Sequence, residues 1–127
     1  MIPHLPKGMT SPEVAAVLFA AFLLLGTVYL GAVAYKARAD RAQCILNIRN
    51  AQTAGRSWQG MYSKCNAAPF HPSDVIGPGK FLDSEPLCPA FRTRYNWVSA
   101  VPPLGSVYMT CPLAAGARHH PTDTTGW

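Results

Sequence analysis

Four cysteines are the residues of this 127-residue chain with the clearest chemistry: Cys44, Cys65, Cys88 and Cys111. Thiols form disulfides in oxidising compartments and bind soft metal ions such as Zn²⁺. Successive cysteines here are separated by 20, 22 and 22 residues, whereas structural zinc sites use ligand pairs about two to four residues apart. The spacing therefore predicts disulfide chemistry and no metal site.

The possible disulfides differ in their geometry. Cys44 and Cys65 lie 21 residues apart on one predicted helix, about 30 Å from each other, whereas a disulfide needs Cα atoms within about 7 Å. Cys88 and Cys111 bracket a predicted hairpin, so a bridge between them would join the two strands at their base. We expect the Cys88–Cys111 pair. Cys65 with either of these is the alternative, and Cys44 is then a small buried apolar side chain.

Other reactive groups form no recognised pattern. The adjacent His119 and His120 could bind a metal ion, but without a second ligand pair they are predicted to be exposed tail residues. The residue types of a hydrolase are Ser57, Ser63, His71, Asp74 and Asp83, without a nucleophile motif. The acids that could bind calcium are Asp74, Asp83, Glu85 and Asp123, but they do not have the spacing of an EF-hand. The sequence predicts no enzyme and no cofactor.

An uncharged apolar segment, residues 14–35, precedes all the cysteines. As a helix, its 22 residues would measure about 33 Å, enough for a hydrocarbon core of about 30 Å. A chain this short has no interior that could enclose such a helix on every side. We therefore expect residues 9–35 to form a membrane-spanning helix.

The predicted helix continues beyond the apolar segment, because no proline lies between Pro12 and Pro69. Ser11 is a suitable helix cap and Pro12 suits the first turn. After residue 35 the pattern becomes amphipathic, which extends the helix through residues 36–65 to about 50 residues in total. The apolar stripe consists of Ile45, Ile48, Ala51, Gly55, Trp58 and Tyr62.

The C-terminal half is rich in proline and glycine, with short strand-like runs at residues 80–82, 94–99 and 106–111. Residues 101–105 separate the last two runs and read as a hairpin loop. We expect residues 66–115 to form a small disulfide-containing head that covers the stripe, followed by a flexible tail at 116–127. The predicted fold class is α+β.

The chain is basic, with 11 Lys and Arg against 6 Asp and Glu. The bases that fall in the amphipathic helix lie mostly on the face opposite the apolar stripe. That basic face is predicted to be exposed to solvent, and a role in binding DNA is the less favoured interpretation.

The start of the chain carries a further pattern: Lys7, Gly8, Met9, Thr10 and Glu13, directly before the apolar run. Here the sequence resembles the type IV pilin family, including the pseudopilins of type II secretion. The resemblance implies that residues 1–8 are a leader, cut after Gly8 by a prepilin peptidase, and that the new amine of Met9 is methylated. It also implies that Glu13 pairs with this amine in a neighbouring subunit and sets the register of assembly. The alternative for Glu13 is a helix-start carboxylate at the lipid headgroups.

The resemblance implies an inner-membrane protein with an exported head, whose partners are homologous subunits, an assembly platform and lipid. Lys36, Arg38 and Arg41 outnumber Lys7, and by that count alone the head would be cytoplasmic. Four cysteines in a small domain favour an oxidising compartment, where disulfides persist. We therefore expect the head to be exported. The predicted function is a structural subunit of a pilus-like or pseudopilus-like filament. The alternative is a signal-anchored protein that keeps residues 1–8, does not polymerise and carries a small binding domain.

Overall fold

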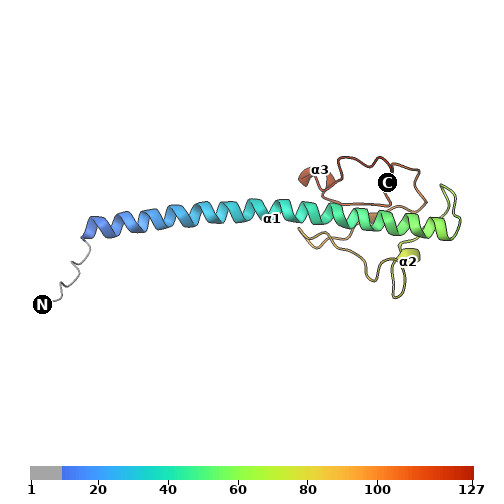
Figure 1. The fold of residues 1–127 in the computed structure, drawn as a ribbon, viewed down its shortest axis with the longest axis horizontal. Coiled ribbons are helices and arrows are strands. Elements are labelled where there is room, and N and C mark those ends of the chain that lie inside the picture. The colour runs from blue at the N-terminus through green and yellow to red at the C-terminus, as the bar shows by residue number, and fades with distance from the viewer. Residues whose placement is uncertain (1–9) are drawn as a thin grey trace, which may run out of the picture. The chain divides into compact units, whose positions relative to one another are not determined.

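The computed structural model describes residues 10–127 and divides into two units, Met1–Lys36 and Ala37–Trp127. Helix α1 (Ser11–Met61) contributes to both (Figure 1). The second unit also contains α2 (Pro72–Val75), β1 (Asn96–Trp97), β2 (Met109–Thr110) and α3 (Ala114–Ala117). The predicted long N-terminal helix and the α+β class are confirmed in these elements.

Local backbone interactions set the start and the end of helix α1. The Thr10 carbonyl accepts hydrogen bonds from the backbone N–H groups of Glu13 and Val14, at 3.0 and 3.1 Å. No proline interrupts the 51 residues of the helix beyond its first turn. The helix stops a few residues earlier than expected, because Ser63 takes the left-handed conformation with φ of 49°.

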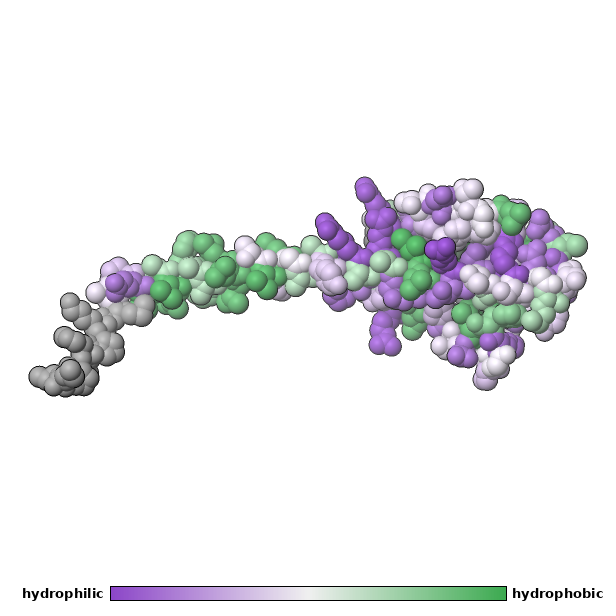
Figure 2. Space-filling model, in the orientation of Figure 1, coloured by the Kyte–Doolittle hydropathy of each residue, from purple (hydrophilic) through white to green (hydrophobic). Residues whose placement is uncertain are grey.

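The first unit exposes its apolar side chains. Phe22, Leu25 and Leu30 are each about two-thirds exposed, and Figure 2 shows apolar surface over this stretch of helix. By length and composition, α1 is the described helix that could cross a membrane. Its apolar part needs a cover other than water.

The second unit contains the predicted hairpin in shortened form. Strands β1 and β2 are antiparallel, with Asn96 opposite Thr110 and Trp97 opposite Met109. The strands are two residues long each. Gly105 sits in the connecting loop with φ of 84°, a conformation that glycine adopts without steric cost.

The predicted strand at residues 80–82 is wrong. Leu82 makes one isolated parallel bridge, to Ile76. The chain between them turns back through Gly77 and Gly79, which have φ of 143° and 74°. Because both values lie in the region that favours glycine, these residues form a turn instead of an extended strand.

The predicted apolar stripe of α1 forms one side of the core, but two of its predicted members are not buried. Cys44 is fully buried where Ile45 is half-buried, and Tyr62 is 58% exposed. The buried positions on α1 are Cys44, Ile48, Ala51, Gln52, Ala54, Gly55 and Trp58. Their steps of three and four residues mark one helix face.

The hairpin packs closely on this face. The Tyr108 ring lies over Gly55, where an added Cβ would come within 2.8 Å of three ring carbons. Gln52 joins α1 to the same part of the hairpin. Its side chain accepts a hydrogen bond from the Tyr108 N–H (2.9 Å) and donates one to the Ser106 carbonyl (3.1 Å). Phe70 meets the Tyr108 ring edge-on at 4.9 Å. Helix and hairpin therefore pack directly against each other, and both contribute residues to each of the two buried clusters.

The C-terminal segment is packed, contrary to the flexible tail expected at 116–127. The Thr124 hydroxyl donates a 2.7 Å hydrogen bond to the Gly105 carbonyl. Arg56 donates to the Trp127 carbonyl at 3.3 Å, and Arg49 lies 5.9 Å from the centre of the Trp127 ring. These contacts tie the segment to α1 and to the hairpin loop.

The close approach at Gly55 gives a direct test of the packing. Gly55→Ala should destabilise the second unit by about 1 to 3 kcal/mol, because the new methyl group overlaps the Tyr108 ring. Gly60→Ala is the matched control, since nothing lies within 4 Å of its added Cβ. The control should be neutral or stabilising by up to about 1 kcal/mol. Thermal unfolding of the full chain in detergent, followed by the fluorescence of Trp58, Trp97 and Trp127, measures both; equal melting temperatures would contradict this packing.

Candidate functional site

The sequence singled out three residues at the start of the chain. Glu13 is exposed, and its Oε2 accepts a 2.7 Å hydrogen bond from the Thr10 N–H. This bond satisfies one of the free donors at the start of α1. Gly8 and Met9 lie outside the described residues. Glu13 thus occupies a helix-start position, and its assembly role stays a prediction.

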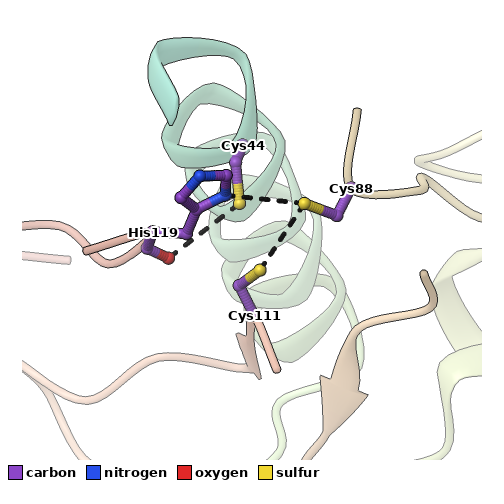
Figure 3. Close-up of side chains that lie close together, drawn as sticks. All are labelled: Cys44, Cys88, Cys111 and His119. Atoms are coloured by element: carbon purple, nitrogen blue, oxygen red, sulfur yellow. Dashed lines mark hydrogen bonds between the residues drawn. The ribbon is translucent and has the colours of Figure 1, made fainter. Parts of the chain in front are cut away.

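A second group lies in the core of the second unit, where four side chains converge (Figure 3). They are Cys44, Cys88, Cys111 and His119. One potential ligand atom from each lies within 4.8 Å of all the others, and all four residues are buried. They come from α1, from the segment before β1, from the residue directly after β2 and from the segment after α3.

The contacts within this Cys/His cluster are direct. The sulfurs of Cys88 and Cys111 are 3.7 Å apart, and the Cys88 sulfur lies 3.5 Å from Nδ1 of His119. The Cys44 thiol donates to the His119 carbonyl at 3.9 Å. Three sulfurs and an imidazole nitrogen therefore face one small volume.

Polar groups surround two of the sulfurs. The Tyr95 hydroxyl is hydrogen-bonded to Cys44, and it accepts a 3.2 Å hydrogen bond from the Asn47 side-chain amide. The backbone N–H of Leu113 is hydrogen-bonded to the Cys111 sulfur. Both hydrogen bonds favour a negatively charged sulfur.

Burial works in the opposite direction. It raises the pKa of the Cys44 thiol to about 12, although the Tyr95 hydrogen bond lowers it. It also raises the pKa of Cys111, against the hydrogen bond from Leu113. The Cys44 and Cys111 thiols are therefore protonated at neutral pH unless a cation enters the cluster.

The structure brings together the pair that the sequence favoured. Cys88 and Cys111 are adjacent, and all four cysteines are present as free thiols, so the disulfide itself stays a prediction. Cys44 is buried, which the sequence analysis expected only together with a bridged Cys65, whereas Cys65 is exposed and outside the cluster. The expectation for His119 is wrong, since it is only 4% exposed. The packed C-terminal segment carries it into the core.

The scattered polar candidates are not assembled into a site. Among residues 10–127, no group of three or more potential metal ligands includes the acids considered for calcium. Asp74 accepts a hydrogen bond from the His71 N–H (2.9 Å) and Asp123 accepts one from the Thr125 N–H (2.8 Å). These acids stabilise local turns.

Comparison with known proteins gives no further guide, because the chain matches no protein-family model, no curated protein and no solved structure. The function must be argued from the residues themselves. Two features carry that argument: the exposed apolar part of α1 with Glu13 at its start, and the buried Cys/His cluster.

Alkylation of the thiols tests the arrangement of the cluster. In the folded full chain, iodoacetamide should modify Cys65, which is exposed, and leave the three buried cysteines unmodified. After unfolding with chelator and without reductant, all four should be modified, as counted by mass spectrometry. Two adducts instead of four after unfolding would establish a disulfide and contradict the free thiols.

Proposed function

We propose that this protein is a membrane-anchored structural subunit of a pilin-like filament, either a type IV pilus or a type II secretion pseudopilus. In this proposal it is cut after Gly8 and assembles through the apolar part of α1. The observation that carries the proposal is the exposed apolar surface of residues 14–35 on a continuous helix that begins beside Glu13.

The apolar part of α1 needs either lipid or other helices around it. A filament core of packed α1 helices offers the same apolar surroundings as the bilayer, so a subunit can pass from one to the other at small cost. Small residues favour close helix packing, and nothing lies within 4 Å of an added Cβ at Gly26 or Gly31. These positions are therefore free to receive a neighbouring helix.

Glu13 supplies a charge that can set the register. A carboxylate enclosed by apolar helices is costly without a cation, and cleavage after Gly8 creates one at the amine of Met9. In the isolated chain the carboxylate bonds to the Thr10 N–H of its own helix. In the filament, the amine of a neighbouring subunit would provide the opposite charge.

The same proposal places the protein in the inner membrane with the second unit exported. Prepilin peptidase would cut the leader on the cytoplasmic side, and an assembly platform would move the subunit from lipid into the filament. The second unit has its own core, so it can project from the filament without support from neighbours.

The mature N-terminus is the first test. Intact-mass and peptide mass spectrometry of the protein from its host should find a chain that starts at Met9 and carries one N-terminal methyl group. A chain that still begins at Met1 and remains monomeric in the membrane would contradict the proposal. It would instead favour the signal-anchored protein.

Two substitutions at Glu13 separate its two possible roles. Glu13→Ala removes both the charge and the hydrogen bond to Thr10, whereas Glu13→Gln keeps an acceptor oxygen and removes the charge alone. Both should insert into the membrane yet lower filament yield on the order of tenfold or more, because the partner amine loses its counter-charge. Electron microscopy of sheared surface filaments gives the yield. Normal filaments from the Gln variant would show that helix capping is the only role of this residue.

A further inference from the structure

We propose that Cys44, Cys88, Cys111 and His119 bind one Zn²⁺ ion, which holds the second unit together. This inference concerns residues 37–127 alone and does not depend on the filament proposal. It rests on the convergence of four buried ligands from four separate segments.

The donor set is one that zinc uses. Three thiolates and an imidazole form a Cys3His site, a common tetrahedral arrangement in structural zinc sites. With Zn–S of about 2.3 Å and Zn–N of about 2.0 Å, the edges of the tetrahedron are about 3.8 Å between sulfurs and about 3.5 Å between sulfur and nitrogen. The observed Cys88–Cys111 separation is 3.7 Å and the Cys88–His119 separation is 3.5 Å.

The fourth ligand completes the set with a small movement. Every pair of ligand atoms, including those with the Cys44 sulfur, already lies within 4.8 Å. The sulfur–sulfur edges of about 3.8 Å and the sulfur–nitrogen edges of about 3.5 Å are thus reached by shifts of about 1.3 Å or less. The Cys44 thiol now donates to the His119 carbonyl, and this proton leaves when the sulfur binds the metal.

The surroundings suit bound thiolates. The Leu113 N–H is hydrogen-bonded to the Cys111 sulfur, and the Tyr95 hydroxyl, itself held by Asn47, is hydrogen-bonded to Cys44. Hydrogen bonds of this kind orient metal ligands and tune their basicity. Three thiols release three protons on binding, so the ion and its ligands carry a net charge of −1, which these donors stabilise.

Zinc explains more of the cluster than a disulfide does. A Cys88–Cys111 bond would leave Cys44 and His119 buried in contact with it and without a function. A closed site with four protein ligands leaves no position for water or substrate, which is typical of structural zinc and not of catalytic zinc. The role we infer is therefore stabilisation.

The energetic reason lies in the small size of the regular structure. Strands β1 and β2 are two residues each, and α2 and α3 are four. Small domains with little regular structure commonly need a metal or disulfides to fold stably. A single ion would bind α1, both sides of the hairpin and the C-terminal segment. It would thus connect parts of the second unit that the short strands do not hold together.

Metal content and cobalt spectroscopy of the purified full chain test the site. The protein prepared in detergent should contain equimolar Zn²⁺ by mass spectrometry. After unfolding with chelator and refolding with Co²⁺, it should show the visible ligand-field bands of tetrahedral cobalt and a thiolate-to-cobalt charge-transfer band. A metal-free protein without these bands, a Cys88–Cys111 disulfide, or iron with sulfide in place of zinc would each overturn the proposal.

Matched variants assign the ligands. Cys88→Ser and His119→Asn should weaken Zn²⁺ binding by more than the roughly 10- to 100-fold that loss of a hydrogen bond to a ligand causes. Cys65→Ser and His120→Asn are the controls, because both residues are exposed and lie outside the cluster, and both variants should bind Zn²⁺ as the wild type does. Tyr95→Phe should weaken binding by about 10- to 100-fold.

One further variant keeps the test decisive if a ligand-removing variant fails to fold. His119→Cys retains four ligands and should still bind Co²⁺, with a stronger charge-transfer band from its additional thiolate. A His119→Cys spectrum identical to that of the wild type would exclude His119 as a ligand. Unchanged zinc content in Cys88→Ser would likewise contradict the assignment.

Discussion

The packing of the hairpin against one face of α1 is the interaction on which the second unit depends. The face is narrow, and at Gly55 the absence of a side chain lets the Tyr108 ring lie against the helix backbone. Gln52 joins the same two elements by hydrogen bonds in both directions. The sheet is too small to have a core of its own, so α1 supplies one wall of it. Everything that the hairpin carries, including Cys111, is positioned by this contact.

Sequence reasoning found the elements with strong and repeated signals. The lack of proline after Pro12 and the long apolar run predicted α1, and steps of three and four residues predicted most of its buried face. The same spacing also fits Cys44, which precedes Ile48 by four residues and is buried where the stripe named Ile45. The strand at 80–82 was wrong because Gly77 and Gly79 take positive φ and turn the chain back, so that Leu82 makes local backbone hydrogen bonds to Val75 and Gly77.

Sequence reasoning predicted part of the Cys/His cluster, the proximity of Cys88 and Cys111, and missed His119. Cys111 directly follows β2, and the turn that pairs Leu87 with Arg94 brings Cys88 back to the same end of the hairpin. The sequence predicted that these two cysteines meet, but it did not predict this turn. No periodicity marks His119, whose position depends on the C-terminal segment packing over Gly105 and Arg56. The lack of close ligand pairs argued against a metal site in the sequence, whereas the proposed zinc site takes each ligand from a different segment. The packing of distant segments brings these four side chains together, and no local motif in the sequence records that packing.

The two units are stabilised in different ways, and this difference links the two proposals. The second unit buries its own core and converges four ligands within it, whereas residues 14–35 require an external apolar environment. A thiolate bound to zinc is occupied by the metal and does not pair with another thiol, so such a site is compatible with an exported unit. In the proposed filament, the second unit would keep its structure when the apolar helix moves from lipid to filament, because its core is formed within one chain. The free energy of assembly would then come mainly from α1 and from Glu13.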